Sequence, residues 1–120
     1  MNLEHLFAGQ NAFTNEVIEL LVEKTINCRL KGLELGYNEL TDRSAVLLSR
    51  CETFHNLRAL WLNGNRIGDE GARAIRTSER LPNLQFLALE RRYLSAEEQR
   101  LLIGRHGDGM LFCGGPMANP

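Results

Sequence analysis

The chain's three cysteines and three histidines are the residues most able to bind a metal or attack a substrate. Cys28 and His55 are separated by 27 residues, and Cys51 precedes His55 by one helical turn. These side chains supply at most three ligands, with no CxxC pair and no His-x3-His spacing to define a tetrahedral zinc site. Buried structural cysteines and a loop histidine explain the pattern better. We therefore expect no metal site.

Catalytic patterns are equally weak. The histidines lie far apart in the sequence, so no Cys–His or Ser–His–Asp arrangement can be inferred. The neighbouring Glu97 and Glu98 fall where a helix is expected to begin, and the helix dipole accounts for them there. The glycine-rich segment 103–110 lacks the strand–GxxxxGK–helix context of a phosphate loop, and Gly104 is expected to end a helix. We expect no catalytic residues, no cofactor and no enzymatic activity.

Composition excludes several further classes of protein. The 120 residues are enough for one domain, and 14 basic against 15 acidic residues give a net charge of −1, unlike a nucleic-acid binder. No apolar run approaches the roughly 20 residues of a membrane span, and the amino terminus does not resemble a signal peptide. The odd cysteine count and the lack of an Asn-x-Ser/Thr sequence favour a cytoplasmic protein. Neither a nucleic acid nor a membrane is expected as a partner.

An internal repeat with a period of 27 residues organises the chain. Its copies read LEHLFAGQNAFT, LKGLELGYNELT, LRALWLNGNRIG and LQFLALERRYLS, beginning at Leu3, Leu30, Leu57 and Leu84. The fourth position is always leucine, the sixth is Ala8, Leu35, Leu62 or Leu89, and the ninth is Asn11, Asn38 or Asn65 and then Arg92. The period predicts repeats at 3–29, 30–56, 57–83 and 84–110 within a domain spanning 1–110. Residues 111–120 are expected to form a degenerate last strand, with Leu111 in the position of Leu84, and a flexible tail.

Each copy predicts a short strand followed by a helix. Apolar residues at the fourth and sixth positions share one face of a strand, whereas the second half has apolar residues at helical intervals. Expected N-caps are Thr14, Thr41 and Ser95, with Asp69 taking that role in the third copy and Ser95–Glu98 forming a capping box. Two inward-facing columns are expected on the helices: Leu20, Leu47, Ala74 and Leu101, and beside it Leu21, Leu48, Ile75 and Leu102.

The LxxLxLxxNxL pattern resembles the leucine-rich repeat over Leu3 to about Met110. The phrases NRIGDEGARAI and LPNLQFLAL are similar to the ribonuclease-inhibitor-like subtype. The resemblance implies an α/β solenoid, a short horseshoe with parallel strands on its concave face and helices on its convex face. It also implies that Asn11, Asn38 and Asn65 turn inward and satisfy backbone groups of neighbouring repeats. Arg92 cannot do so, so the fourth repeat is expected to be irregular.

The concave face is the predicted functional surface. Large aromatic side chains and arginine dominate binding hot spots, and we expect Phe7, Trp61 and Phe86 to cluster there. The candidate partner-binding residues are Phe7, Glu34, Tyr37, Trp61, Asn63, Phe86, Glu90 and Arg91. The main hypothesis is a non-enzymatic module that binds a polypeptide through this face.

Two alternatives stay open. Ribonuclease-inhibitor-like repeats also occur in activators of small GTPases, and Arg91 or Asn63 would be the residue presented to the enzyme. A chain without visible caps is also compatible with a fragment or a structural repeat that self-associates through its ends.

Overall fold

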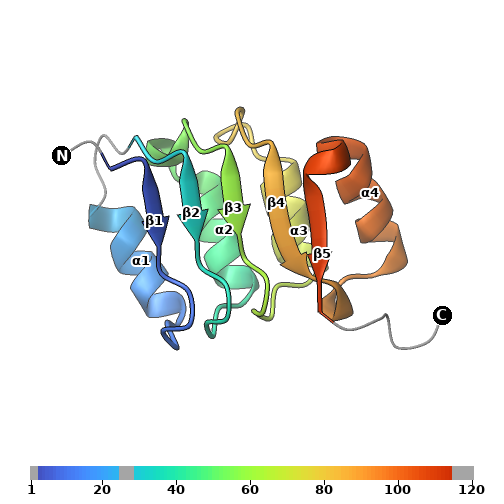
Figure 1. Ribbon diagram of the computed structural model, residues 1–120, viewed down its shortest axis with the longest axis horizontal. Helices are drawn as coiled ribbons and strands as arrows, with labels where there is room; N and C mark the ends of the chain where they lie inside the picture. The colour runs from blue at the N-terminus through green and yellow to red at the C-terminus, as the bar shows by residue number, and fades with distance from the viewer. Residues whose placement is uncertain (1–2, 25–28, 115–120) are drawn as a thin grey trace.

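The computed structural model describes residues 3–24 and 29–114 (Figure 1). Strands and α-helices alternate along these residues, and short 3-10 helices occupy some connections. The strands are β1 His5–Phe7, β2 Gly32–Glu34, β3 Ala59–Trp61, β4 Phe86–Glu90 and β5 Met110–Cys113. The α-helices are α1 Asn15–Lys24, α2 Asp42–Arg50, α3 Asp69–Arg76 and α4 Ala96–His106. The 3-10 helices are η1 Glu52–Phe54, η2 Arg91–Tyr93 and η3 Gly107–Gly109.

The five strands form one parallel sheet in chain order, from β1 to β5. Leu6, Leu33, Leu60 and Leu87 are register partners on β1 to β4, which is the alignment expected from the 27-residue spacing. Their side chains point into the core, where all but the half-buried Leu6 are fully buried. A parallel sheet with a helix between successive strands fits an α/β repeat fold.

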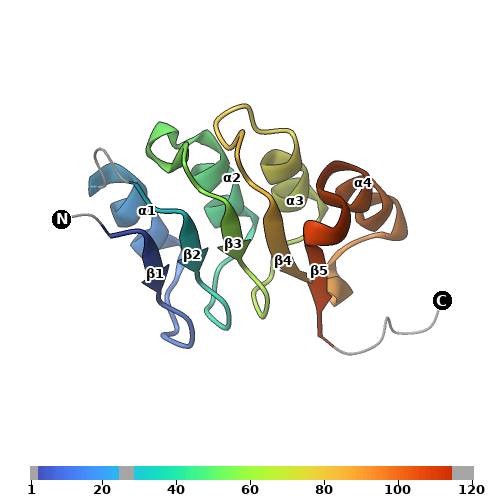
Figure 2. The same ribbon diagram turned by 45° about the horizontal axis from the view of Figure 1, so that its top comes forward.

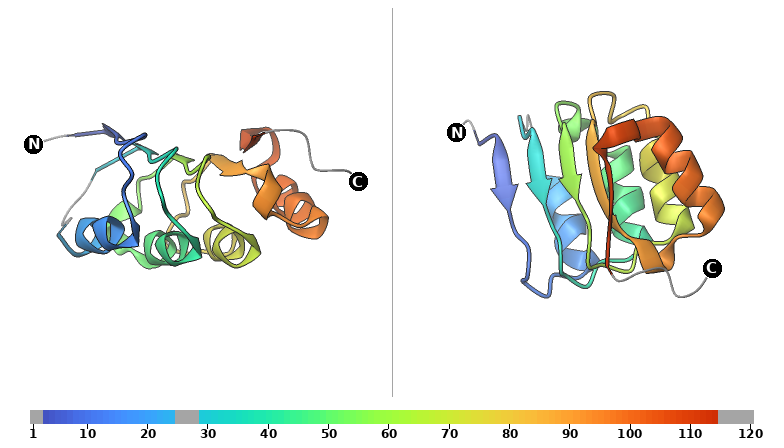
Figure 3. Two further views of the ribbon diagram at one scale, coloured as in Figure 1. Left: turned by 90° about the horizontal axis from the view of Figure 1, so that it is seen from below. Right: turned by 45° about the vertical axis from the view of Figure 1, so that its right-hand side comes forward.

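The helices lie along one face of the sheet (Figure 3). Figures 1 and 2 show the same arrangement from the side of the sheet, with the strands in front of the helices. The four helices begin 27 residues apart, at Asn15, Asp42, Asp69 and Ala96. Within the described residues no α-helix covers the other face, which we call the open face.

Of the two expected inward columns, one reaches the core along its whole length and the other only at Leu47. Leu48, Ile75 and Leu102 are buried, and Leu21 packs against the core. In the other column Leu47, Ala74 and Leu101 are half-buried, and Leu20 is exposed. Neighbouring residues of a helix differ by about 100° in direction, so both columns cannot point at the sheet. The prediction for the Leu20 column was therefore wrong for the exposed Leu20, and only Leu47 of this column packs against the core.

The last strand departs from the period. Leu111 pairs with Ala88 on β4, so its predicted alignment with Leu84 was wrong. The reason is the length of the connection between helix and strand. Residues 77–85 join α3 to β4, whereas only 107–109 join α4 to β5. The shorter connection brings β5 to the sheet sooner.

The helix N-caps follow the sequence only in part. Ser95 caps α4, because its hydroxyl accepts a hydrogen bond from the Glu98 amide at 3.0 Å. Thr41 precedes α2 without capping it, since its hydroxyl accepts from Asn15 Nδ2 instead. Asp69 does not cap α3; its carboxylate accepts from the Ser95 amide at 2.9 Å.

Two other expectations for α4 were wrong. The carboxylate of Glu98 forms two hydrogen bonds with the Arg76 guanidinium and not with the Ser95 amide, so no capping box closes. Gly104 lies inside the helix, and the C-cap is Gly107, whose φ of 55° suits glycine.

Candidate protein-interaction surface

Trp61 and Phe86 form an aromatic pair on the open face. Their positions on the neighbouring strands β3 and β4 bring the ring centroids to 4.9 Å, with the planes tilted by 43°. Both side chains are half-buried, so each ring is partly packed and partly open to solvent. We call these two residues the aromatic platform. Such a surface offers apolar area at low entropic cost, because few rotatable bonds need to be fixed.

Phe7 stands apart from the platform. The register places Glu34 between Phe7 and Trp61, so two strand spacings, about 10 Å, separate the two aromatic residues. The Phe7 ring stacks on His5 at a centroid distance of 6.4 Å, and 76% of its surface is exposed. The expected cluster of three rings is therefore reduced to Trp61 and Phe86.

The two acidic candidates are both engaged by the protein itself. Glu34 is half-buried, and its carboxylate accepts a hydrogen bond from the Gly36 amide. Glu90 is buried, because the pairing of β5 with β4 places Cys113 beside it. One Glu90 oxygen accepts from the Gly64 amide at 3.0 Å. Glu90 is therefore part of the framework beneath the surface.

Asn63 and Arg91 keep unused hydrogen-bonding capacity at the carboxyl end of the strands. Asn63 Oδ1 and Arg91 Nε are buried and have no partner within the described part of the chain. The Arg91 guanidinium lies 5.7 Å from the centre of the Phe112 ring. Tyr37 is exposed and in the left-handed region (φ 56°), with its ring over Gly64, where a Cβ would come within 2.5 Å of it.

Asparagine side chains join neighbouring strand ends. Asn38 Oδ1 accepts from the Asn11 and Phe13 amides at 2.9 and 3.0 Å, and its Nδ2 donates to the Ala8 and Leu35 carbonyls. Asn65 repeats these bonds exactly one period later with Asn38, Leu40, Leu35 and Leu62. Each asparagine therefore satisfies backbone groups that the turn leaves unpaired. We call Asn11, Asn38 and Asn65 the asparagine ladder.

The asparagine ladder weakens at both ends. Asn11 is exposed, and the one side-chain bond resolved for it runs from Nδ2 to the Gly9 carbonyl at 3.0 Å. At the other end Arg92 is exposed and lies 3.6 Å from the Glu90 carboxylate. At the end of β3 the acceptor is instead a carboxylate oxygen of Glu90, which accepts from the Gly64 amide.

A second ladder of polar side chains, which we did not predict, joins the helix starts. Asn15, Asp42 and Asp69 accept hydrogen bonds from the amides of Thr41, Gly68 and Ser95, at 3.1, 2.6 and 2.9 Å. Each therefore caps the helix that follows its own. The sequence contained the signal, because these three positions are 27 residues apart and all carry a side-chain oxygen.

The cysteines and histidines form no reactive group in the described structure. His55 is exposed and Cys51 is half-buried, and the described residues contain no cluster of three His, Cys, Asp or Glu side chains suited to a metal ion. Cys28 lies outside the described residues. Burial raises the pKa of the Cys113 thiol and the nearby Glu90 carboxylate raises it further, so this thiol is a poor nucleophile at neutral pH.

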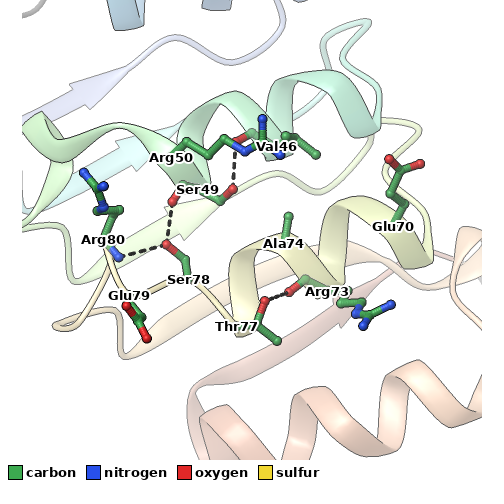
Figure 4. Close-up of a pocket in the computed structure, with 10 residues that line it drawn as sticks. All are labelled: Val46, Ser49, Arg50, Glu70, Arg73, Ala74, Thr77, Ser78, Glu79 and Arg80. Atoms are coloured by element: carbon green, nitrogen blue, oxygen red, sulfur yellow. Dashed lines mark hydrogen bonds between the residues drawn. The ribbon is translucent and has the colours of Figure 1, made fainter.

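A groove of about 580 Å³ runs between α2 and α3 on the helix side (Figure 4). Its hydroxyl groups are already used by the backbone. Thr77 donates to the Arg73 carbonyl, Ser49 donates to the Val46 carbonyl, and Ser78 donates to the Ser49 carbonyl. The first two bonds are local to one helix, the third joins the segment after α3 to α2, and none of these hydroxyl groups is activated for chemistry.

The match to a known family falls in the centre of this structure. Residues 55–75 match the leucine-rich repeat family. They include β3 with Trp61, Asn65 of the asparagine ladder and most of α3. The match supports a leucine-rich repeat protein, and such domains are generally non-enzymatic and mediate protein–protein interaction. No curated protein matches the chain.

The helices provide one further observation. None of those described in 3–24 and 29–114 has the length and apolar character needed to cross a membrane.

Proposed function

We propose that this chain is a non-enzymatic protein-interaction module that binds a polypeptide through the open face of its sheet. In this proposal the four segments at 3–29, 30–56, 57–83 and 84–110 are leucine-rich repeats of the ribonuclease-inhibitor-like subtype. They form a short solenoid whose concave side is the open face, with 111–120 as its degenerate end. We also propose a cytoplasmic location, on the basis of the cysteine usage.

The observation that carries the proposal is the aromatic platform. Trp61 and Phe86 contact each other at 4.9 Å, yet neither is fully buried, although the core beneath them is well packed. Partly exposed aromatic pairs of this kind are typical of binding hot spots.

The other candidates lie around this platform. Tyr37 is exposed, and Asn63 and Arg91 have unpaired polar atoms at the carboxyl ends of the strands. Glu34 and Phe7 extend the proposed surface towards β1, whereas the buried Glu90 supports it from below.

An affinity purification from native lysate tests the proposal. The tagged wild type, Trp61→Ala and the control Tyr93→Ala would be compared, with folding checked by circular dichroism. Tyr93 is an exposed aromatic residue on η2, outside the platform. We expect Trp61→Ala to capture at least tenfold less of a partner that Tyr93→Ala still captures. Identical partner lists for all three proteins would contradict the proposal.

A further inference from the structure

A carboxylate lies on the open face of β2, between β1 and β3 (Figure 1). It belongs to Glu34, which follows the buried core residue Leu33 and therefore points to the opposite face of the sheet. None of the five strands contains a lysine or an arginine. The sheet itself therefore supplies no permanent positive charge to this carboxylate.

Two glycines make room for the carboxylate. A Cβ on Gly9 would lie 2.6 Å from Glu34 Oε2, and a Cβ on Gly36 would lie 2.9 Å from Glu34 Oε1. Neither glycine has a positive φ, so the backbone conformation alone would permit other residues. The close approach of the carboxylate requires glycine at both positions instead. We call Glu34, Gly9 and Gly36 the carboxylate patch, in which the two glycines place no side chain over the charge.

One oxygen of this carboxylate is left for a ligand. Glu34 Oε1 accepts a hydrogen bond from the Gly36 amide, whereas Oε2 has no hydrogen bond or ion pair in the described part of the chain. The other carboxylate of the open face is different. Glu90 lies 3.6 Å from the Arg92 guanidinium and also accepts from the Gly64 amide. Because a half-buried charge is costly without a partner, a cation placed at Glu34 would be stabilised there.

Aromatic rings flank the carboxylate patch on both sides. The register places Phe7 on β1 and Trp61 on β3 directly beside Glu34, with about 10 Å between these two strands. A methylene chain in contact with a ring on each side needs about 7–8 Å between the rings. The faces of aromatic rings also attract a cation that lies within about 6 Å of their centres. The surroundings of Glu34 therefore suit the long apolar stem and charged end of a lysine or arginine side chain.

We propose that the polypeptide bound by the open face presents a lysine or arginine side chain to Glu34, with its stem between Phe7 and Trp61. The same polypeptide places an apolar side chain on the aromatic platform. This inference rests on the proposed function, because it names the chemistry of the partner that the open face binds. The argument from charge is specific: the patch has a free carboxylate oxygen, and the strands hold no lysine or arginine to occupy it.

The strand spacing also predicts how the two side chains are arranged in the partner. The aromatic platform is centred between β3 and β4, so it lies about 7 Å from β2 across the sheet. Residues i and i+2 of an extended chain point to the same side and are also about 7 Å apart. A partner that crosses the strands in an extended conformation therefore has its basic residue two positions from a large apolar residue.

Selection from a library of random peptides displayed on phage tests the inference. We expect the wild type to enrich peptides that contain lysine or arginine two positions from a large apolar residue. Glu34→Gln should still enrich apolar residues but not basic ones. Glutamine keeps an oxygen that can accept from the Gly36 amide, so this variant is expected to fold, which circular dichroism would verify. Glu70→Gln, which removes an exposed carboxylate on α3, is the control and should select the same peptides as the wild type.

The possible results separate this inference from the proposed function. A wild type that selects peptides without any preference for basic residues would overturn the inference and leave the proposed function intact. A preference for basic residues that persists in Glu34→Gln would have the same meaning. A wild type that enriches no peptide, or a selection that Trp61→Ala leaves unchanged, would contradict the proposed function and this inference with it.

Fluorescence anisotropy with the most enriched peptide measures the pairing directly. Replacing its basic residue by alanine should weaken binding to the wild type about tenfold. The same replacement should weaken binding to Glu34→Gln less than about twofold, because the carboxylate is already absent from that variant. Equal losses with the two proteins would show that the basic residue binds elsewhere and would overturn the inference.

Discussion

Asn65 and Asn11 occupy the same position in the sequence pattern but contribute unequally to the fold. Asn65 is buried and bonds to backbone groups of its own and the preceding strand end, whereas Asn11 is exposed. Leaving buried backbone groups unpaired costs about 1–3 kcal/mol each. We expect Asn65→Ala to lower the free energy of unfolding by roughly 2–4 kcal/mol and Asn11→Ala by less than about 0.5 kcal/mol.

Urea unfolding followed by circular dichroism would measure both variants. Asn38→Ala serves as the internal check, because its bonds are those of Asn65 one period earlier. Equal losses for Asn11→Ala and Asn65→Ala would contradict the conclusion that the buried Asn65 stabilises the stack more than the exposed Asn11.

His106 predicts a dependence of stability on pH. Burial lowers the pKa of His106 from 6.5 to about 4, with a smaller contribution from Arg105, and neither ring nitrogen has a hydrogen-bond partner among the described residues. The unfolded chain takes up a proton near pH 6.5, whereas the folded chain does so only near pH 4. Stability is therefore full above pH 6.5 and is lost as the pH falls towards 4. We expect a loss of about 1 kcal/mol between pH 7.5 and 5.5.

Urea titrations at several pH values would measure this slope. His106→Leu should flatten it, and replacement of the exposed His55 by glutamine should leave it unchanged. A slope that persists in His106→Leu would assign the pH dependence to another group.

At the scale of elements, two glycines of α4 have different structural roles. Gly104 lies inside the helix and Gly107 ends it with a φ of 55°, and an added Cβ meets nothing within 4 Å at either position. Only backbone preference then distinguishes them. We expect Gly104→Ala to raise the free energy of unfolding by about 0.5–1 kcal/mol and Gly107→Ala to lower it by about 1 kcal/mol. Thermal melts of the two variants would show shifts of opposite sign; shifts of the same sign would contradict this account of the C-cap.

The strands and helix starts could be predicted from the sequence because one buried residue fixes each register. Leu33, Leu60 and Leu87 leave no alternative pairing that buries all three. The position of β5 could not be predicted in this way. It depends on how far α4 extends and how short its connection is, and Leu111 is half-exposed, so burial does not fix its register.

Helix orientation was a harder inference than helix position. Leu20 and Leu21 are both apolar, and the sequence alone did not show which one faces the core. The second ladder was missed for another reason. Asn15, Asp42 and Asp69 resemble ordinary caps of their own helices, whereas their partners lie 26 residues ahead.

At the scale of the whole molecule, the open face follows from the alternation of residues along each strand. Trp61 and Phe86 could be placed there because the 27-residue register determines which face of the sheet each of them occupies. The burial of Glu90 could not be predicted, since it depends on β5, whereas the register already placed Glu34 between Phe7 and Trp61. The surface is consequently smaller than the sequence indicated, and it centres on β3 and β4.

Site-specific photo-crosslinking in native lysate tests the role of this surface most directly. A benzophenone amino acid would replace Phe86 on the open face or, as the control, the exposed Thr77 on the helix side. We expect illumination to join a partner polypeptide to the protein labelled at position 86 and not to the protein labelled at position 77. Crosslinks from position 77 with none from position 86 would contradict the account.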